Sequence, residues 1–296
     1  MAFNWQTFRI RTISSFIFMA VMLTGLLWNQ WSFLGLFSLI HFGCWWEYLK
    51  LTEKIHKTSF HAYTKLGLMV MGYGLMLWFC GTAYTINGYG VKENLSLPVS
   101  VAGFTLLLMG IFRKNKISLK AVGTAMLGLL YISLCWGLML DLYQTQIQVD
   151  LHGAAYIVGA AGEMFLPVII IVSLWMNDTM AYLVGSMIGK TPLTKISPKK
   201  TWEGTLGGII LGIAIMIFLF PLVFGHKPGD LISLLGPVSA IVAITGTLGD
   251  LLESKLKRMA AVKDSGALLP GHGGYLDRFD SLLIATPFAW LYINFL

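Results

Sequence analysis

Residues suited to phosphate chemistry gather in two short stretches of the sequence. Residues 177–203 and 250–280 make up 58 of the 296 residues, yet they contain 16 of the 35 charged ones. Both stretches mix acidic side chains, which can bind a divalent cation, with lysines, which can bind phosphate groups. Such a mixture in an otherwise apolar chain predicts phosphate chemistry at a membrane surface.

The second stretch supplies the acids best suited to bind a metal. Asp250 ends an apolar run, and Asp277 and Asp280 stand three positions apart, which puts them on one face of a helix. Mg²⁺ usually takes one or two carboxylates and completes its shell with phosphate oxygens and water. These acids are therefore candidate magnesium ligands. The alternative for Asp277 and Asp280 is a structural role in salt bridges to Arg278 and the nearby lysines.

A glycine-rich turn in the same stretch suits an anion. The letters PGHGG place His272 beside Gly273, and glycines let backbone N–H groups approach a phosphate closely. His272 could contact that phosphate or have a structural role. The sequence contains neither the Walker A pattern GxxxxGK[ST] nor an HExxH or Cys/His zinc spacing. The motif is therefore neither that of a P-loop enzyme nor that of a zinc enzyme.

The first stretch adds hydroxyl and ammonium groups and one more acid. Ser197, Lys199 and Lys200 could together cradle a phosphate, although lysines here would also satisfy the positive-inside rule without any catalytic role. Asp178 ends an apolar run, where an acid is costly unless it is solvated, paired or bound to a cation. A helix-terminal acid in the head-group zone is the alternative explanation for Asp178.

The residues after this cluster predict how the next helix begins and packs. Thr201 and Glu203 are residue types that cap a helix N-terminus. Gly204, Gly207 and Gly208 follow, and small residues at this spacing allow another helix to approach closely. We therefore expect a capped, closely packed helix directly after the lysine cluster.

The composition identifies an integral membrane protein. Hydrophobic residues make up 56% of the chain and charged residues only 12%, against roughly 25% charged residues in a soluble domain. We therefore expect a single membrane domain over residues 1–296. The net charge of +7 suits anionic lipid head groups and nucleotide phosphates. Nucleic acid is not an expected partner, because we expect no soluble basic face to bind it.

Nine apolar runs predict an all-α polytopic fold with about nine transmembrane helices. The expected spans are residues 10–28, 31–49, 66–86, 95–112, 120–140, 155–176, 205–224, 231–249 and 281–296. Lysines and arginines fall in alternate loops, so the positive-inside rule places the N-terminus and the active-site loops on the cytoplasmic side. Segment 178–189 is too short to span. We expect a re-entrant or interfacial helix there, or an extension of the preceding span.

A long spaced signature lies at residues 254–280. It reads S-K-L-K-R-x4-K-D-S-G-x2-L-P-G-H-G-G-Y-x-D-R-F-D and resembles the signature of the phosphatidate cytidylyltransferases, the CDP-diacylglycerol synthases. The segment NDTMAY…GK…SPKKTWEG resembles the second shared region of that family. The similarity is strong over residues 177–280, the expected catalytic core, and weak over residues 1–150. Tyr275 departs from the pattern, which usually has an aliphatic residue or Phe there.

The resemblance implies a Mg²⁺-dependent nucleotidyltransferase with two metal sites. It would convert CTP and phosphatidate, taken from the inner leaflet of a bacterial inner membrane, to CDP-diacylglycerol and pyrophosphate. A homodimer is left open. The match to the family's acidic positions assigns metal binding to Asp250, Asp277 and Asp280, with Asp178 as a weaker candidate. The implied catalytic residues are Asp250, Lys263, Asp277, Arg278 and Asp280. The implied substrate contacts are Ser197, Lys199, Lys200, Ser254, Arg258, Asp264, His272 and Gly273.

Other classes of protein remain as alternatives. A transporter or channel would place its polar groups near the bilayer midplane on broken helices, whereas here they stand at span ends and in loops. A non-catalytic membrane scaffold would not need matched acids and cations. Among enzymes, the main alternative is a related transferase that acts on another lipid phosphate. A CDP-alcohol phosphotransferase is disfavoured, because its DG…AR…G…D…D pattern is absent from the sequence.

Overall fold

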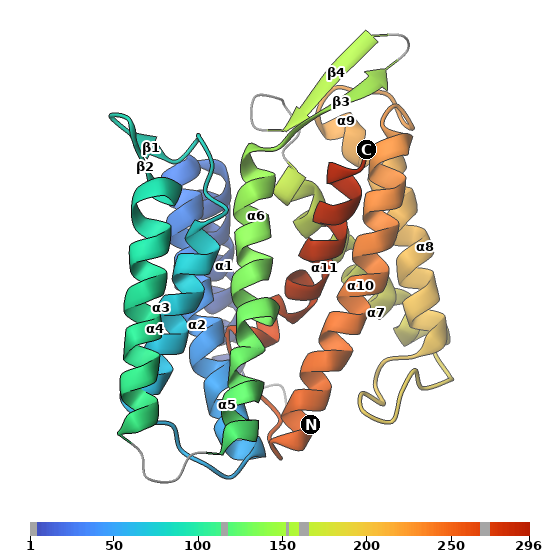
Figure 1. Cartoon of the computed structure of the whole chain (residues 1–296). Coiled ribbons are helices and arrows are strands. Elements are labelled where there is room, and N and C mark those ends of the chain that lie inside the picture. The colour runs from blue at the N-terminus through green and yellow to red at the C-terminus, as the bar shows by residue number, and fades with distance from the viewer. Residues whose placement is uncertain (1–4, 114–117, 152–153, 160–165, 267–272) are drawn as a thin grey trace. The chain divides into compact units, whose positions relative to one another are not determined.

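The computed structural model describes residues 5–113, 118–151, 154–159, 166–266 and 273–296 (Figure 1). Most of these residues are helical, as the sequence predicts. The chain divides into two compact units. Unit 1 contains residues 1–140 and 256–279, and unit 2 contains residues 141–255 and 280–296. Each unit is described by itself.

Unit 1 is a set of helices with one short hairpin. Its elements are α1 (Trp5–Leu27), α2 (Gln30–Ile55), α3 (Ala62–Leu77), β1 (Thr85–Ile86), β2 (Tyr89–Gly90), the π-helix η1 (Lys92–Ser96), α4 (Leu97–Phe112), α5 (Leu119–Met126), the π-helix η2 (Leu129–Leu134) and the first part of α6 (Cys135–Gln144). The sequence begins α2 with a capping box, in which Asn29 and Ser32 exchange side-chain to backbone hydrogen bonds. Glycines let α3 and α4 approach, since a Cβ at Gly103 would meet the backbone of Met71.

Unit 2 combines long apolar helices with one hairpin. Its elements are β3 (Gln146–Leu151), β4 (Ala154–Gly159), α7 (Leu166–Ile188), α8 (Trp202–Phe218), α9 (Phe220–Val223), most of α10 (Ile232–Met259) and most of α11 (Leu276–Asn294). Strands β3 and β4 are antiparallel, with Gln146 opposite Gly159 and Leu151 opposite Ala154. Helices α10 and α11 begin in one unit and end in the other, so each unit contains part of both helices.

Five described helical segments are long and apolar enough to cross a membrane. They are Lys92–Phe112, Leu119–Gln144, Leu166–Ile188, Trp202–Val223 and Ile232–Met259. This supports a membrane protein, and the total of about nine spans remains a prediction. Residues 178–188 continue α7, which favours the extension of the preceding span over a separate re-entrant or interfacial helix.

Four expectations about these elements need correction. The fold is not purely helical, because two hairpins interrupt it. The span expected at 155–176 begins with a strand, Ala154–Gly159, because a short apolar run fits a strand as well as a helix and pairing with β3 decides the outcome. The helix expected at 66–86 ends at Leu77, and a turn follows it. Asp178, finally, is not a span-end residue but lies ten residues before the end of α7.

Candidate functional site

The largest concentration of predicted site residues in unit 2 surrounds a cavity of ≈ 370 Å³. Helices α7, α8 and α10 and the loop before α8 form its walls. The lining residues are Asn177, Asp178, Ala181, Tyr182, Gly185, Ser186, Lys199, Lys200, Thr201, Gly204, Thr205, Thr247 and Asp250. Residues that are about 50 to 70 positions apart in the sequence thus meet at one cavity.

Small residues on α7 and α8 form one wall of this cavity. A Cβ at Gly208 would lie 2.6 Å from the Cβ of Ala181, and one at Gly204 would lie 2.9 Å from the carbonyl oxygen of the same alanine. A Cβ at Gly207 would similarly meet Val184. The glycines therefore permit the close helix approach that the sequence predicts. This approach holds Asp178 on α7 beside the loop that precedes α8.

The loop before α8 is folded back on itself by hydrogen bonds. The backbone N–H of Leu193 donates to the Lys200 carbonyl at 2.7 Å, and the Lys200 N–H donates to the Ser197 carbonyl at 3.1 Å. Thr201 is the N-cap of α8, as predicted, and its hydroxyl accepts a bond from the Gly204 N–H at 3.2 Å. The side chain of Glu203 binds the start of the same loop, at Lys190 and Thr191. These bonds aim Lys199 and Lys200 at the cavity, while Ser197 shapes the turn behind them.

The carboxylate of Glu203 accepts bonds from the backbone N–H groups of Lys190 at 3.1 Å and Thr191 at 3.1 and 3.2 Å. These two donors directly follow α7. Glu203 therefore ties the exit of α7 to the first turn of α8. The carboxylate also interacts with the backbone of Glu203 itself in the first turn of α8, as expected of a capping acid, and the added contacts close the loop that carries the lysines.

Opposite charges meet inside the cavity. Lys200 forms an ion pair with Asp250, and Asp178 interacts electrostatically with both of them. The Ser254 hydroxyl donates to the second oxygen of Asp250 at 3.3 Å, which is a long bond. Side chains of the Lys200–Asp250 pair retain 32% and 27% exposure, so a ligand can reach them. Two carboxylates next to two lysines can bind a cation and a phosphate together.

Asn177 adds a further oxygen that the sequence reasoning did not include in the site. Its side chain is 4% exposed and lines the cavity. Its Nδ2 faces Asp178 at 3.4 Å, and its Oδ1 has no hydrogen-bond partner among the described residues. Buried polar atoms without a partner are rare in folded proteins. The amide of Asn177 and the acids Asp178 and Asp250 thus form a set of hard oxygen donors that fits Mg²⁺.

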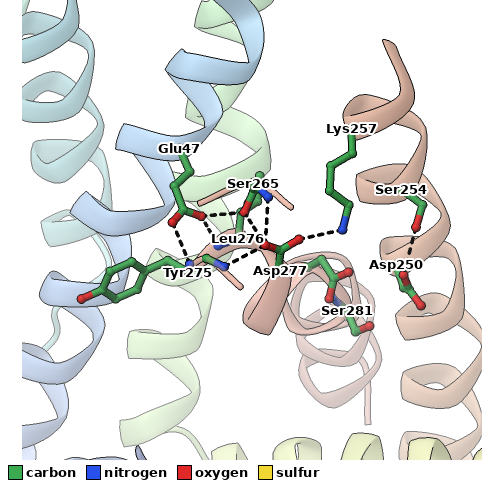
Figure 2. A network of polar contacts seen from close by, with 11 residues as sticks. Glu47, Asp250, Ser254, Lys257, Ser265, Tyr275, Leu276, Asp277 and Ser281 are labelled. Carbon is green, nitrogen blue, oxygen red and sulfur yellow. Dashed lines mark hydrogen bonds and ion pairs between the residues drawn. The ribbon is translucent and has the colours of Figure 1, made fainter. Parts of the chain in front are cut away.

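Asp277 lies in unit 1, in a dense hydrogen-bond network (Figure 2). Its Oδ1 binds the Lys257 ammonium at 2.6 Å. Its Oδ2 accepts bonds from the Gly274 N–H at 2.8 Å and from the N–H and hydroxyl of Ser265, both at 2.9 Å. Both carboxylate oxygens are therefore engaged with protein donors. The pair with Lys257 is one of the salt bridges to nearby lysines that the sequence offered as the structural alternative for Asp277.

Sequence reasoning missed a second acid in this network, Glu47 on α2. Its side chain is 5% exposed and accepts bonds from the Ser265 hydroxyl at 2.7 Å and from the N–H groups of Tyr275 at 3.0 Å and Leu276 at 2.8 Å. The available signal was an acid within an apolar run, which is costly unless it has partners. Its partners follow more than 200 positions later, so no local pattern reveals them.

The remaining predicted residues differ in exposure and surroundings. Exposed side chains belong to Arg258, Lys263, Asp264 and Arg278. Asp280 is 8% exposed, and its Oδ1 accepts the Ser281 N–H at 2.6 Å. Gly273 has φ +80°, a conformation that favours glycine. His272 lies outside the described residues.

Helices α10 and α11 are close together in unit 2 near two of the predicted acids. A Cβ at Gly249 would lie 2.6 Å from the Asp280 carbonyl oxygen and 3.0 Å from the Ser281 Cα. Gly249 therefore lets the backbones of Asp250 and Asp280 approach each other. Among the described residues, no three His, Cys, Asp or Glu side chains are placed to hold one metal ion together. A Mg²⁺ ion at this site would rely on few carboxylates, as this ion commonly does.

Comparisons with known proteins agree with the resemblance seen in the signature. The model of the cytidylyltransferase family matches residues 9–296. The phosphatidate cytidylyltransferase of Thermotoga maritima is 31% identical over 275 residues, which cover 90% of this chain and 88% of that protein. The Bacillus subtilis protein of the same name is 38% identical over 196 residues, covering 65% of this chain and 66% of that protein.

A plant protein is similar over a shorter stretch of the chain. The chloroplastic phosphatidate cytidylyltransferase 4 of Arabidopsis thaliana is 47% identical, but only over 118 residues, or 40% of this chain and 29% of that protein. The family model, in contrast, extends over nearly the whole chain. On these matches and the site geometry above, the chain belongs to the cytidylyltransferase family.

Proposed function

We propose that the protein is a phosphatidate cytidylyltransferase, which converts CTP and phosphatidate to CDP-diacylglycerol and pyrophosphate. The observation that carries this proposal is the family match over residues 9–296. The unit 2 cavity supports it, since it combines Asp178 and Asp250 with Lys199 and Lys200 beside apolar helices. Nucleotide phosphates and a lipid phosphate both need such cationic and metal-binding groups.

The reaction requires little proton chemistry. A phosphate oxygen of phosphatidate forms a bond to the α-phosphorus of CTP, and the bond from that phosphorus to the bridging oxygen breaks as pyrophosphate leaves. The nucleophile is already ionised near neutral pH, so no strong general base is needed. The remaining task is to position two polyanions and to stabilise the charge that develops on the phosphates. Lysines that border the cavity suit this task.

Mg²⁺ is the metal that fits the oxygen donors of the cavity. Asp178 and Asp250 would hold it, with the amide oxygen of Asn177 as a further donor. When bound, it would neutralise phosphate charge next to the leaving group. Asp277 and Asp280 remain candidate ligands for one of two metal sites.

The cationic residues would bind and orient the phosphates. Lys200 is the primary candidate, because it already pairs with an acid in the cavity, and Lys199 lies beside it. Further phosphate contacts are proposed for Ser197, Ser254, Arg258, Lys263 and Arg278. Phosphatidate would enter from the inner leaflet of a bacterial inner membrane, with the site on the cytoplasmic side and its acyl chains left among the apolar helices. A homodimer is compatible with this arrangement.

The test is the reaction itself, measured on protein purified in detergent. CTP, Mg²⁺ and phosphatidate are supplied, and CDP-diacylglycerol is followed by mass spectrometry. We expect product that disappears with EDTA and returns with added Mg²⁺. Parallel reactions contain a polyprenyl phosphate in place of phosphatidate. If only the polyprenyl phosphate gives product, it and not phosphatidate is the substrate. If neither lipid gives product, the proposed activity is contradicted.

A further inference from the structure

We infer that Glu47 is a positioning residue for nucleotidyl transfer, an inference that rests on the proposed function. Glu47 is a buried acid on α2, far in sequence from the signature, yet it binds two parts of the signature at once (Figure 2). Its contacts fix the chain immediately around Asp277. We expect it to act on the rate of transfer and to leave nucleotide affinity nearly unchanged.

The carboxylate of Glu47 is matched to the first residues of α11. The Tyr275 N–H donates to Oε1 at 3.0 Å and the Leu276 N–H donates to Oε2 at 2.8 Å. The first N–H groups of a helix lack partners within the helix, and the helix dipole favours negative charge there. A residue from another helix thus caps α11 from outside. This cap holds the turn on which Asp277 and Arg278 stand.

Ser265 links Glu47 to Asp277. Its hydroxyl oxygen lies 2.7 Å from Glu47 Oε2 and 2.9 Å from Asp277 Oδ2, so both carboxylates approach one hydroxyl. Its backbone N–H also donates to Asp277. The hydroxyl has a single proton to donate, so the two acids share it. Displacement of Glu47 is therefore transmitted to the Asp277 carboxylate through one side chain.

Two glycines of the signature make room for Glu47. A Cβ at Gly266 or at Gly274 would overlap the Glu47 carboxylate. One turn earlier on α2, the Tyr275 ring packs directly on Gly43, where a Cβ would also overlap it. The signature segment is thus shaped around this face of α2 in three places. Such close complementarity is what a role in positioning requires.

The diagnostic variant is Glu47→Gln. Each oxygen of Glu47 accepts a backbone N–H, so the amide of glutamine must direct its NH₂ at one of those donors whichever way it turns. We expect kcat to fall roughly 100-fold, because small displacements of catalytic groups have effects of this size. KM for CTP should stay within about threefold, since the hydrogen bonds of Glu47 go to Ser265, Tyr275 and Leu276, none of which lines the unit 2 cavity.

The matched control is Glu53→Gln on the same helix. Glu53 also accepts a backbone N–H, from Phe60 at 2.6 Å, and it pairs with Lys65 at 2.9 Å, but it contacts no part of the signature in these bonds. Its kcat should stay within about twofold of the original. Thermal unfolding in detergent is measured for both variants, so that kcat can be expressed per folded molecule.

The outcomes separate the inference from the proposed function. A wild-type protein without cytidylyltransferase activity contradicts the proposed function before any variant is compared. If the wild type is active and the folded Glu47→Gln variant has an unchanged kcat, the positioning role is overturned, whatever the unfolding temperature of the variant. If Glu47→Gln does not fold, Glu47→Asp is the test variant. It keeps the negative charge but has a side chain shorter by one methylene, which moves the carboxylate away from its donors. A lowered kcat with unchanged KM for CTP in Glu47→Asp supports the role, and a wild-type kcat overturns it.

Discussion

The acids of the unit 2 cavity and the acids of the unit 1 network have opposite surroundings. Asp250 pairs with Lys200 and keeps 27% exposure, and Asp178 shares the same cavity. Glu47 and Asp277 are instead surrounded by donors from the backbone, from Ser265 and from Lys257. An acid that is exposed to a cavity can exchange its partner for a ligand, whereas an acid saturated by protein donors stabilises a fixed shape. Asp250 and Asp277, which the resemblance groups together, therefore need not have one role.

The largest expected effect is loss of activity without loss of fold in Asp250→Asn. The change removes a charge from the cavity but keeps a side chain of the same shape. We expect kcat/KM to fall by roughly 100-fold to 1000-fold, the size typical for removal of one electrostatic contact at a reaction centre. The product assay and thermal unfolding check this together. An active Asp250→Asn variant would remove Asp250 from the catalytic group.

Asp277→Asn should instead affect both activity and stability. The change leaves the Lys257 ammonium beside a neutral amide, and the new NH₂ must face a protein donor. We expect a loss of about 1–3 kcal/mol in the free energy of unfolding, the cost of an unmade buried hydrogen bond, together with lower kcat. Denaturant unfolding in detergent measures the first quantity. Wild-type stability in this variant would break the contrast between the two regions.

Lys200→Ala should weaken CTP binding more than Lys199→Ala does. Both lysines line the cavity, and among the described residues Lys200 is the one that forms an ion pair with Asp250. A rise of roughly tenfold in KM for CTP, equivalent to about 1.4 kcal/mol, is expected for Lys200→Ala. Initial rates at varied CTP concentration give both values. Equal rises in KM for the two substitutions would show that the ion pair with Asp250 does not make Lys200 the more important lysine for CTP binding.

Gly208→Ala tests whether the wall of the cavity depends on close helix packing. The added methyl group would meet Ala181 at 2.6 Å, so α7 and α8 must separate. We expect a destabilisation of about 1–3 kcal/mol, typical of overpacking. Gly123→Ala on α5 is the control, because nothing lies within 4 Å of its added Cβ. A Gly208→Ala variant as stable as this control would contradict the packing argument.

The smallest effect is expected for Tyr275→Phe. Burial, with the added influence of Cys44 and Glu47, raises the pKa of the Tyr275 phenol above its ordinary value. The phenol therefore stays protonated over the whole range below about pH 9, and any stability linked to it would be lost only as pH rises through the raised pKa. We expect the pH–rate profile of Tyr275→Phe to superimpose on that of the original protein. A displaced limb between pH 6 and about pH 9 would assign the phenol a part in the reaction.

The sequence predicted well what is local and poorly what is distant. Apolar length located most helices, and charge density located Asp178, Lys200 and Asp250, which the fold brings to one cavity. The strand at 154–159 was missed because its pairing with residues 146–151, not its own composition, determines it.

Two site residues illustrate the same limit. Glu47 was missed because its donors lie at the other end of the chain. The resemblance grouped Asp277 with the metal ligands without describing its donors, and that assignment stays a prediction. The structure gives those donors as Lys257, Ser265 and Gly274. Residue type thus marked Asp250 and Asp277 alike, and only three-dimensional contacts separate the exposed acid from the saturated one.

The separation of Glu47 from its partners has a consequence for biosynthesis. Leu276, the last of its donors, follows Glu47 by 229 positions. At a synthesis rate of about 5–20 residues per second, Leu276 is therefore added roughly 10–45 s after Glu47. During that time α2 contains a carboxylate without its native partners. The nascent protein must therefore keep this end of α2 in contact with water or with an insertion factor, and α2 can reach its final packing only after Leu276 has been synthesised.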